Sequence, residues 1–144
     1  MSLLDVKATT GRVMGIDFGE SRTGLALSDA ARFLASGLGN IPGGGLEKTA
    51  ERILEAAREH NAVALVLGLP VNMNGTEGPR AARVRELGAL LEAHLPVYLM
   101  DERMTTMAAA RFLNETNTRG KKRKGVIDTL SAEIILQNAL DRLR

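Results

Sequence analysis

The chain lacks cysteine and tryptophan, and its 144 residues include only three phenylalanines, one tyrosine and two histidines. The absence of cysteine excludes disulfide bonds, zinc fingers and thiol catalysis, and it suits a reducing cytoplasm. Because the aromatic side chains are so few and the core can use all of them, recognition of single strands by base stacking is not expected.

Long apolar runs are also absent. No stretch approaches the roughly twenty apolar residues of a membrane-spanning helix, and the N-terminal sequence MSLLDVKATTGR lacks the apolar core of a signal peptide. We therefore expect a cytoplasmic protein with no membrane partner. The length is that of one common domain and lets about two-thirds of the unfolded surface be buried, so residues 1–144 are expected to form a single domain.

The net charge is only +2, but its distribution is uneven. The segment 103–125 carries one acid, Glu115, against seven bases, a net +6 that leaves −4 for the rest of the chain. Such a block predicts contact with a polyanion, and the alternative is a solvated charge run. Apart from Arg111, the bases of this segment are the residues that we expect to contact nucleic acid: Arg103, Arg119, Lys121, Lys122, Arg123 and Lys124.

Hydrophobic periodicity predicts a mixed α/β order along the chain. Strands are expected at 13–17, 24–29, 33–41, 62–69 and 97–100, and helices at 46–60, 76–94, 105–113 and 127–143. The continuous apolar run AVALVLGL at 62–69 is typical of a strand that helices cover on both faces. The order predicts three antiparallel strands followed by parallel ones, in a five-stranded sheet with helices on both faces. Thr76 is expected to cap the second helix.

Asp17 ends the first predicted strand, directly after an apolar run. Aspartate is disfavoured in strands, so at a strand end it indicates either turn chemistry or a ligand. The turn that follows has residues of its own for bending, because Gly19 and Gly24 supply conformational freedom and the residues between them are polar. Asp17 is therefore expected to serve other chemistry. The alternative is that it accepts backbone N–H bonds in the hairpin.

Further acidic residues lie at element ends. Asp101 and Glu102 follow the last short strand, and at most one of them can face the same way as Asp17, because adjacent strand residues point to opposite faces. The other is expected to pair with Arg103 or to cap the next helix. Alternation does not decide between them where the strand is about to end. Asp128 lies in the first turn of the final predicted helix, where capping and the helix dipole also favour aspartate.

These acidic positions could converge if the strands that carry Asp17 and Glu102 are neighbours in the sheet. Carboxylates at close range repel one another unless a cation neutralises them. Hard oxygen ligands select Mg²⁺ or Mn²⁺ rather than zinc, and two such ions about 4 Å apart would clamp the attacking and leaving oxygens of a phosphodiester. The basic segment before Asp128 would hold the phosphate backbone against this centre. The pattern suits phosphoryl transfer on nucleic acid.

Four motifs follow one another in order: GIDFG with GLALSD at 15–29, GLPVNMNGT at 68–76, DERMTT at 101–106 and IDTLSAEIILQ at 127–137. On these motifs, from Val13 to about Leu140, the chain resembles the YqgF family, also called RuvX, of the ribonuclease H-like superfamily. Ser131 stands where alanine is more usual in the family. The resemblance implies a ribonuclease H-like fold and a metal-dependent nuclease.

The resemblance also implies site residues and substrates. The catalytic carboxylates, which would also ligate two Mg²⁺ or Mn²⁺ ions, would be Asp17, Glu102 and Asp128. The family has been linked to Holliday junctions and to the 5′ end of precursor 16S ribosomal RNA. We favour the ribosomal substrate, and thus a role in ribosome biogenesis, because the family is most often described in that way. Symmetric cleavage of a junction would call for a homodimer.

Two other classes compete with a nuclease. An actin-like ATPase also has a D-x-G…G hairpin like that of Asp17, Gly19 and Gly24, but it closes two such lobes around its nucleotide, and this chain has room for one. A non-catalytic nucleic-acid-binding module would use the basic surface alone. The three acids argue against such a module, because carboxylates repel phosphate unless metal ions intervene.

Overall fold

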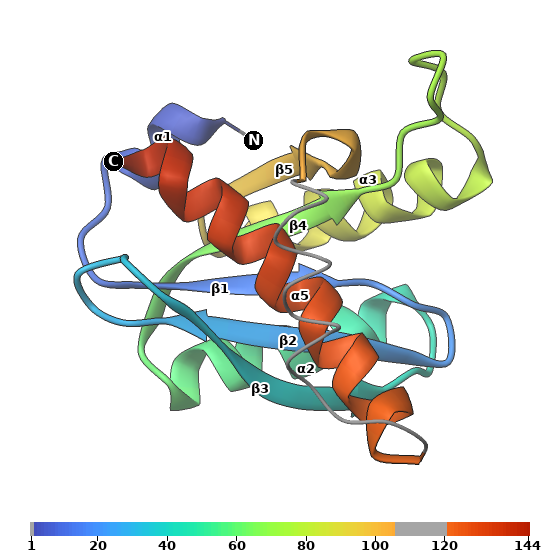
Figure 1. Ribbon diagram of the computed structural model, residues 1–144, viewed down its shortest axis with the longest axis horizontal. Helices are drawn as coiled ribbons and strands as arrows, with labels where there is room; N and C mark the ends of the chain where they lie inside the picture. Colours follow the sequence, from blue (N-terminus) through green and yellow to red (C-terminus); the bar gives the residue numbers. More distant parts are fainter. Residues whose placement is uncertain (1, 106–120) are drawn as a thin grey trace.

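Five strands form one mixed sheet in the computed structural model, which describes residues 2–105 and 121–144, the side chains of 121–129 excepted. The strand order is β3-β2-β1-β4-β5 (Figure 1). β1 is antiparallel to β2 and β2 to β3, whereas β1 and β5 both run parallel to β4. The strands are β1 Arg12–Asp17, β2 Arg22–Ser28, β3 Ala35–Pro42, β4 Ala62–Leu69 and β5 Val97–Asp101. The predicted sheet is confirmed.

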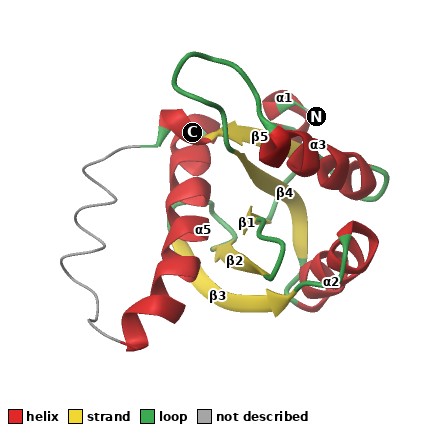
Figure 2. Cartoon of the chain, turned by 90° about the vertical axis from the view of Figure 1, so that its right-hand side faces the viewer, coloured by secondary structure: helices red, strands yellow, loops and turns green. Residues whose placement is uncertain are grey.

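Helices cover both faces of this sheet (Figure 2). They are α1 Leu3–Lys7, α2 Leu46–Glu59, α3 Pro79–Glu92 and α5 Lys121–Leu143, with the short 3-10 helix η1 Glu102–Met104. α2 and α3 pack on one face, in a cluster that includes Ile16 of β1 and Leu67 of β4. α5 packs on the other face, in a cluster that includes Val13 and Val66. Because both faces of β4 are covered, its sequence is apolar throughout.

Glycine at the centre of β1 lets α5 lie directly on the sheet. Alternation sends Val13, Gly15 and Asp17 to the face of α5. A Cβ atom added at Gly15 would lie 2.6 Å from Cβ of Leu136 and 3.0 Å from the carbonyl oxygen of Ala132. Such distances leave no room for a side chain, so the position of α5 depends on this glycine.

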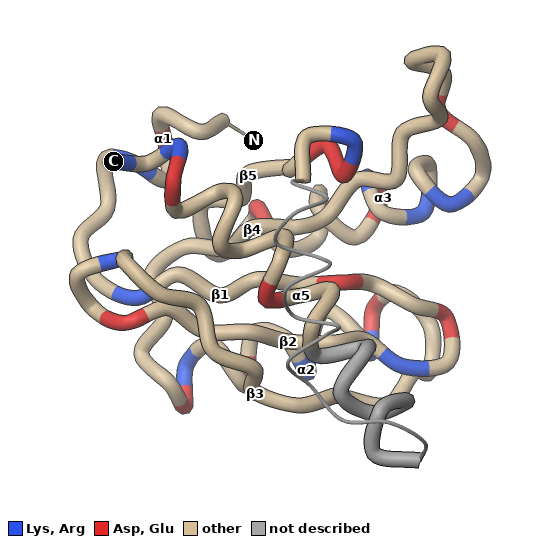
Figure 3. The backbone as a smooth tube through the Cα atoms, viewed as in Figure 1, with Lys and Arg blue, Asp and Glu red and all other residues tan. Residues whose placement is uncertain are grey.

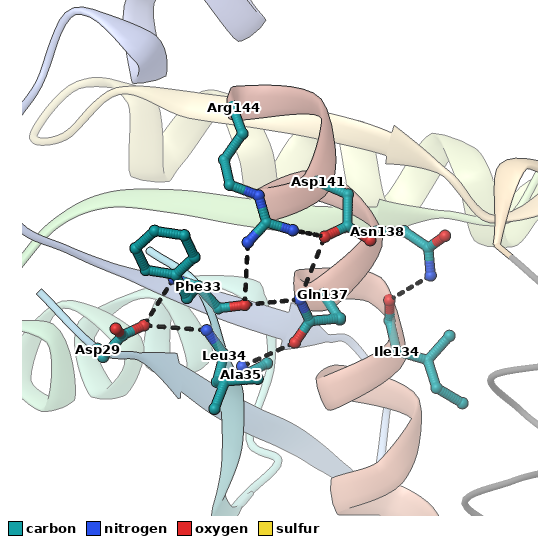
Figure 4. A network of polar contacts seen from close by, with 9 residues as sticks. All are labelled: Asp29, Phe33, Leu34, Ala35, Ile134, Gln137, Asn138, Asp141 and Arg144. Atoms are coloured by element: carbon teal, nitrogen blue, oxygen red, sulfur yellow. Dashed lines mark hydrogen bonds and ion pairs between the residues drawn. The ribbon is translucent and has the colours of Figure 1, made fainter. Parts of the chain in front are cut away.

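α5 runs antiparallel to β3 and therefore to β1. Near its C-terminal end, Gln137 accepts a hydrogen bond from the Ala35 N–H and donates one to the Phe33 carbonyl oxygen, each at 2.9 Å (Figure 4). One turn earlier, the Glu133 carboxylate accepts a hydrogen bond from the backbone N–H of Gly37. Residue numbers thus rise along α5 in the direction in which they fall along β3. Its N-terminal end is directed toward the end of the sheet at which β1 finishes.

The second predicted helix begins later than expected. Thr76 does not cap it: its hydroxyl donates to Oδ1 of Asn74 at 2.6 Å and accepts from Nδ2 of Asn72 at 3.0 Å, within a turn. The N-cap is Gly78, and the helix starts at Pro79, where the fixed φ of proline is already helical. The segment between β4 and α3 is therefore a hydrogen-bonded turn.

Two other helix predictions differ from the structure. The final helix begins at Lys121 rather than at 127, so that 121–124 belong to its first turn and not to a loop. The short helix α1, which Ser2 caps by accepting from the Leu4 N–H, was not predicted. The helix predicted at 105–113 falls on residues 106–120, outside the described part of the chain. None of the described helices is both long and apolar enough to span a membrane.

Candidate functional site

Asp17 is the last residue of β1, and its neighbours on the two adjacent strands are glycines. It is paired with Gly24 of β2, and because Ile16 lies beside Leu67 of β4, the next residue of each strand brings Asp17 level with Gly68. Cross-strand neighbours share a face of the sheet. Neither strand neighbour of the half-buried Asp17 therefore carries a Cβ.

Glu102 lies on the same face as Asp17. In the register of β4 and β5, Gly68 is beside Met100, which belongs to the cluster under α5. Glu102 follows β5 directly, as the first residue of η1. A Cβ atom added at Gly68 would lie only 3.4 Å from Cδ of Glu102. The Glu102 carboxyl group therefore lies over the glycine that separates it from Asp17.

Asp101 is held by its own segment. It caps η1 by accepting from the Arg103 N–H at 2.9 Å, and both its oxygens accept from the Arg103 guanidinium at 2.8 to 3.2 Å. These bonds to Arg103 hold the pKa of Asp101 below its usual value. Asp101 thus pairs with Arg103, as expected of the outward acid, and it caps η1, whereas the predicted helix 105–113 lies largely outside the described residues.

Glu102 has the opposite electrostatic environment. Burial raises the pKa of its carboxyl group, and the charge on Asp101 raises it further, while the nearby guanidinium of Arg80 acts in the opposite direction. Its carboxylate makes no hydrogen bond or ion pair with the side chains described here. Desolvation without a close partner is costly for a carboxylate, and a cation would relieve that cost.

The strands of Asp17 and Glu102 are not neighbours, contrary to the condition set from the sequence. β4 lies between them, so their backbones are about 10 Å apart, two strand spacings. Glycine at position 68 makes up for part of this separation, because the Glu102 side chain reaches over it toward β1. Sequence reasoning did not single out Gly68, although a glycine inside an apolar strand signals a close approach.

Asp128 lies in the backbone of α5, and its side chain is outside the described residues. It precedes Ala132 by four residues, and the carbonyl oxygen of Ala132 would lie 3.0 Å from a Cβ atom added at Gly15 of β1. Four helix residues advance about 6 Å and two strand residues about 6.6 Å. Since α5 is antiparallel to β1, moving from Ala132 to Asp128 and from Gly15 to Asp17 leads in the same direction along the sheet.

The predicted basic residues are divided among different environments. The guanidinium of Arg103 is bound by Asp101, the last residue of β5. Figure 3 shows acidic and basic positions next to each other at the end of β5. Lys121, Lys122, Arg123 and Lys124 lie in the first turn of α5 by backbone, and their side chains are outside the described residues, as is all of Arg119. A further cation, Arg80, was not predicted from the sequence.

The donor set fits a hard divalent cation. Asp17 and Glu102 offer only carboxylate oxygens, the ligands that Mg²⁺ and Mn²⁺ prefer, and an added Cβ at Gly68 would come into van der Waals contact with the Glu102 carboxyl group. Among the side chains that the structure describes, no group of three acids, histidines or cysteines is gathered closely enough to hold a metal ion.

Three comparisons with known proteins match almost the whole chain. The family model described as "RuvX: Holliday junction resolvase" matches residues 11–142. A Lactiplantibacillus plantarum protein named "Putative pre-16S rRNA nuclease" is 48% identical over 136 residues, covering 91% of this chain and 94% of that protein. A Ruminiclostridium cellulolyticum protein of the same name is 41% identical over 135 residues, covering 92% and 95%.

The solved structures share the fold. T. thermophilus RuvC, in complex with a Holliday junction substrate, gives a TM-score of 0.61 at 17% identity, over 92% of this chain and 94% of that one. The same protein in a second structure gives a TM-score of 0.58. The predicted ribonuclease H-like fold is confirmed by this similarity.

Proposed function

Because the chain belongs to the RuvX family, as its motifs predicted, we propose that it is a metal-dependent nuclease that matures the 5′ end of precursor 16S rRNA in the cytoplasm. The observation that supports this most is the arrangement of Asp17 and Glu102, which come from non-adjacent strands to one face of the sheet on either side of Gly68. Carboxylates placed in this way suit divalent cations and, through them, a phosphodiester.

In this proposal Asp17, Glu102 and Asp128 ligate Mg²⁺ or Mn²⁺, two ions in all. When bound, the cations would activate water and neutralise the charge that develops on the phosphate. The chain's own contribution is to hold the carboxylates in place. β1 positions Asp17 between two glycines, and the Asp101–Arg103 pair fixes the 3-10 turn that carries Glu102.

The substrate is proposed from the relatives. The curated relatives are named for pre-16S rRNA, whereas the family description names a Holliday junction resolvase. Junction cleavage is therefore the second candidate, and it alone would require a homodimer for symmetric incision. For either substrate, the basic residues at 119–124 would bind phosphates that flank the cleaved bond, a contact that positions the strand without reading its sequence.

The proposal predicts metal-dependent cleavage of the RNA. Wild-type protein is incubated with a labelled RNA that spans the 5′ end of the 16S precursor, and separately with a labelled four-way DNA junction. With Mg²⁺ or Mn²⁺ present, the RNA is cut, and chelation of the metal by EDTA stops the reaction. Cleavage of the junction alone would favour the second candidate. Binding of both substrates without cleavage, with either metal, would contradict a nuclease.

A further inference from the structure

Arg80 occupies a position that neither the motifs nor the comparisons assign. We infer that Arg80 binds a phosphate of the nucleic-acid strand next to the Asp17–Glu102 site, an inference that rests on the proposed nuclease function. The ligand class is a phosphodiester oxygen pair, which a guanidinium can bind with two parallel N–H bonds. Such a contact would hold the strand in place during cleavage, whatever its sequence.

The fold places Arg80 between the two segments that carry the acids. It lies in the first turn of α3, which follows directly on the turn after β4, the strand between Asp17 and Glu102. One turn further along α3, Arg83 donates to both oxygens of Glu20 at 3.0 and 3.2 Å, and Glu20 lies three residues after Asp17. The start of α3 is thereby fixed to the loop that follows β1.

On its other side Arg80 faces the segment of Glu102. The positive charge of its guanidinium favours the ionised form of the Glu102 carboxyl group, as an opposite charge nearby does. The same segment reaches the turn before α3, because a Cβ atom added at Gly75 would lie 3.8 Å from a guanidinium nitrogen of Arg103. Arg80 is therefore near the Glu102 carboxylate, although it belongs to α3 and not to the segment that carries Glu102.

The neighbouring arginines are engaged in close ion pairs, whereas Arg80 acts on Glu102 only through its charge. Arg83 is paired with Glu20, Arg85 donates to both oxygens of Glu77 at 2.6 and 2.8 Å, and Arg103 is bound by Asp101. The side chain of Arg80 is exposed, and no hydrogen bond or ion pair joins it to the residues described in the structure. An exposed guanidinium offers five donors. A strand arriving at the carboxylates could bind Arg80 without breaking an existing pair, which it could not do at Arg103.

The test compares Arg80→Gln with Arg85→Gln, a matched loss of one charge on the same helix from an arginine that is paired. Binding of labelled precursor RNA, and of the junction, is measured by anisotropy between 50 and 200 mM salt with Ca²⁺ in place of Mg²⁺. For Arg80→Gln, the slope of log binding constant against log salt concentration should become shallower by about 0.7 to 0.9, the contribution of one phosphate contact. KM for cleavage should rise about tenfold. Arg80→Lys should restore the wild-type slope but reverse only part of the rise in KM, because lysine keeps the charge and cannot form the two parallel N–H bonds to phosphate.

Equal slopes and equal KM values for Arg80→Gln, Arg85→Gln and wild type would overturn the inference about Arg80. The proposed function would stand in that case, because wild type would still cut its substrate. Failure of wild type to bind or cut either nucleic acid would overturn both. Arg80 is exposed, so its variants should keep the wild-type unfolding midpoint, and this is checked first.

Discussion

Glu102→Gln should lower the rate of phosphodiester cleavage by at least about 10³-fold at saturating Mg²⁺, because losing one ligand of a catalytic cation removes several kcal/mol of transition-state stabilisation. The variant keeps the shape of the side chain that lies over Gly68 and removes only its charge. Single-turnover cleavage of the labelled substrate measures the effect, and the unfolding midpoint shows that the fold is intact.

Asp101→Asn is the matched control for that prediction. It removes a charge from the adjacent acid, whose oxygens are bound by Arg103, and the amide oxygen of asparagine can still accept the Arg103 N–H bond that caps η1. Cleavage by this variant should stay within about tenfold of wild type, a change of about 1.4 kcal/mol in the barrier. If Asp101→Asn lost activity and Glu102→Gln kept it, the assignment of the inward acid would be wrong.

Gly15→Val should reduce the free energy of unfolding by about 3 kcal/mol, at the upper end of the cost of overpacking a core. The new Cβ would meet Cβ of Leu136 and the backbone oxygen of Ala132. Neither atom can move unless α5 itself moves away from the sheet. Urea unfolding followed by circular dichroism gives the change, and an unchanged m-value would show that the two-state comparison holds.

Gly68→Ala is the contrasting variant. Its Cβ would meet chiefly Cδ1 of Ile135, the far end of a side chain, at 2.5 Å. A rotamer change can relieve that contact, so the loss of unfolding free energy should be under half that of Gly15→Val. The methyl group would also lie 3.4 Å from Cδ of Glu102, and cleavage should therefore fall more than stability does. Equal losses of stability at the two positions would contradict this account of how α5 packs.

Most of the fold could be predicted because its signals are local. The apolar run of β4 indicates a strand covered on both faces, and Asp17 stands out as a carboxylate at the end of a strand. Which of Asp101 and Glu102 faces inward was not predictable, because the answer depends on the register of β5 against β4 and on the space above Gly68. The register between two strands that are far apart in the sequence cannot be inferred from a short stretch of either one.

Predictions from local sequence patterns were wrong where a residue type fits two different structural roles. Thr76 has the chemistry of an N-cap, but Asn72 and Asn74 engage its hydroxyl in a turn, and Pro79 begins the helix instead. The final helix was expected to begin at 127, whereas residues 121–126 already belong to α5. Arg103 was selected by its place in the basic segment, and only the structure shows that Asp101 binds it.

Manganese binding by wild type and by Asp17→Asn, measured by titration calorimetry without substrate, tests the central claim most directly. Asp29→Asn is the control, because Asp29 follows β2 and accepts hydrogen bonds from the Phe33 and Leu34 N–H groups. Wild type and Asp29→Asn should bind Mn²⁺ with the same affinity, and Asp17→Asn should bind at least about tenfold more weakly, as expected when a carboxylate ligand is lost. Equal binding by all three proteins, or none by wild type, would contradict a metal site at Asp17 and Glu102.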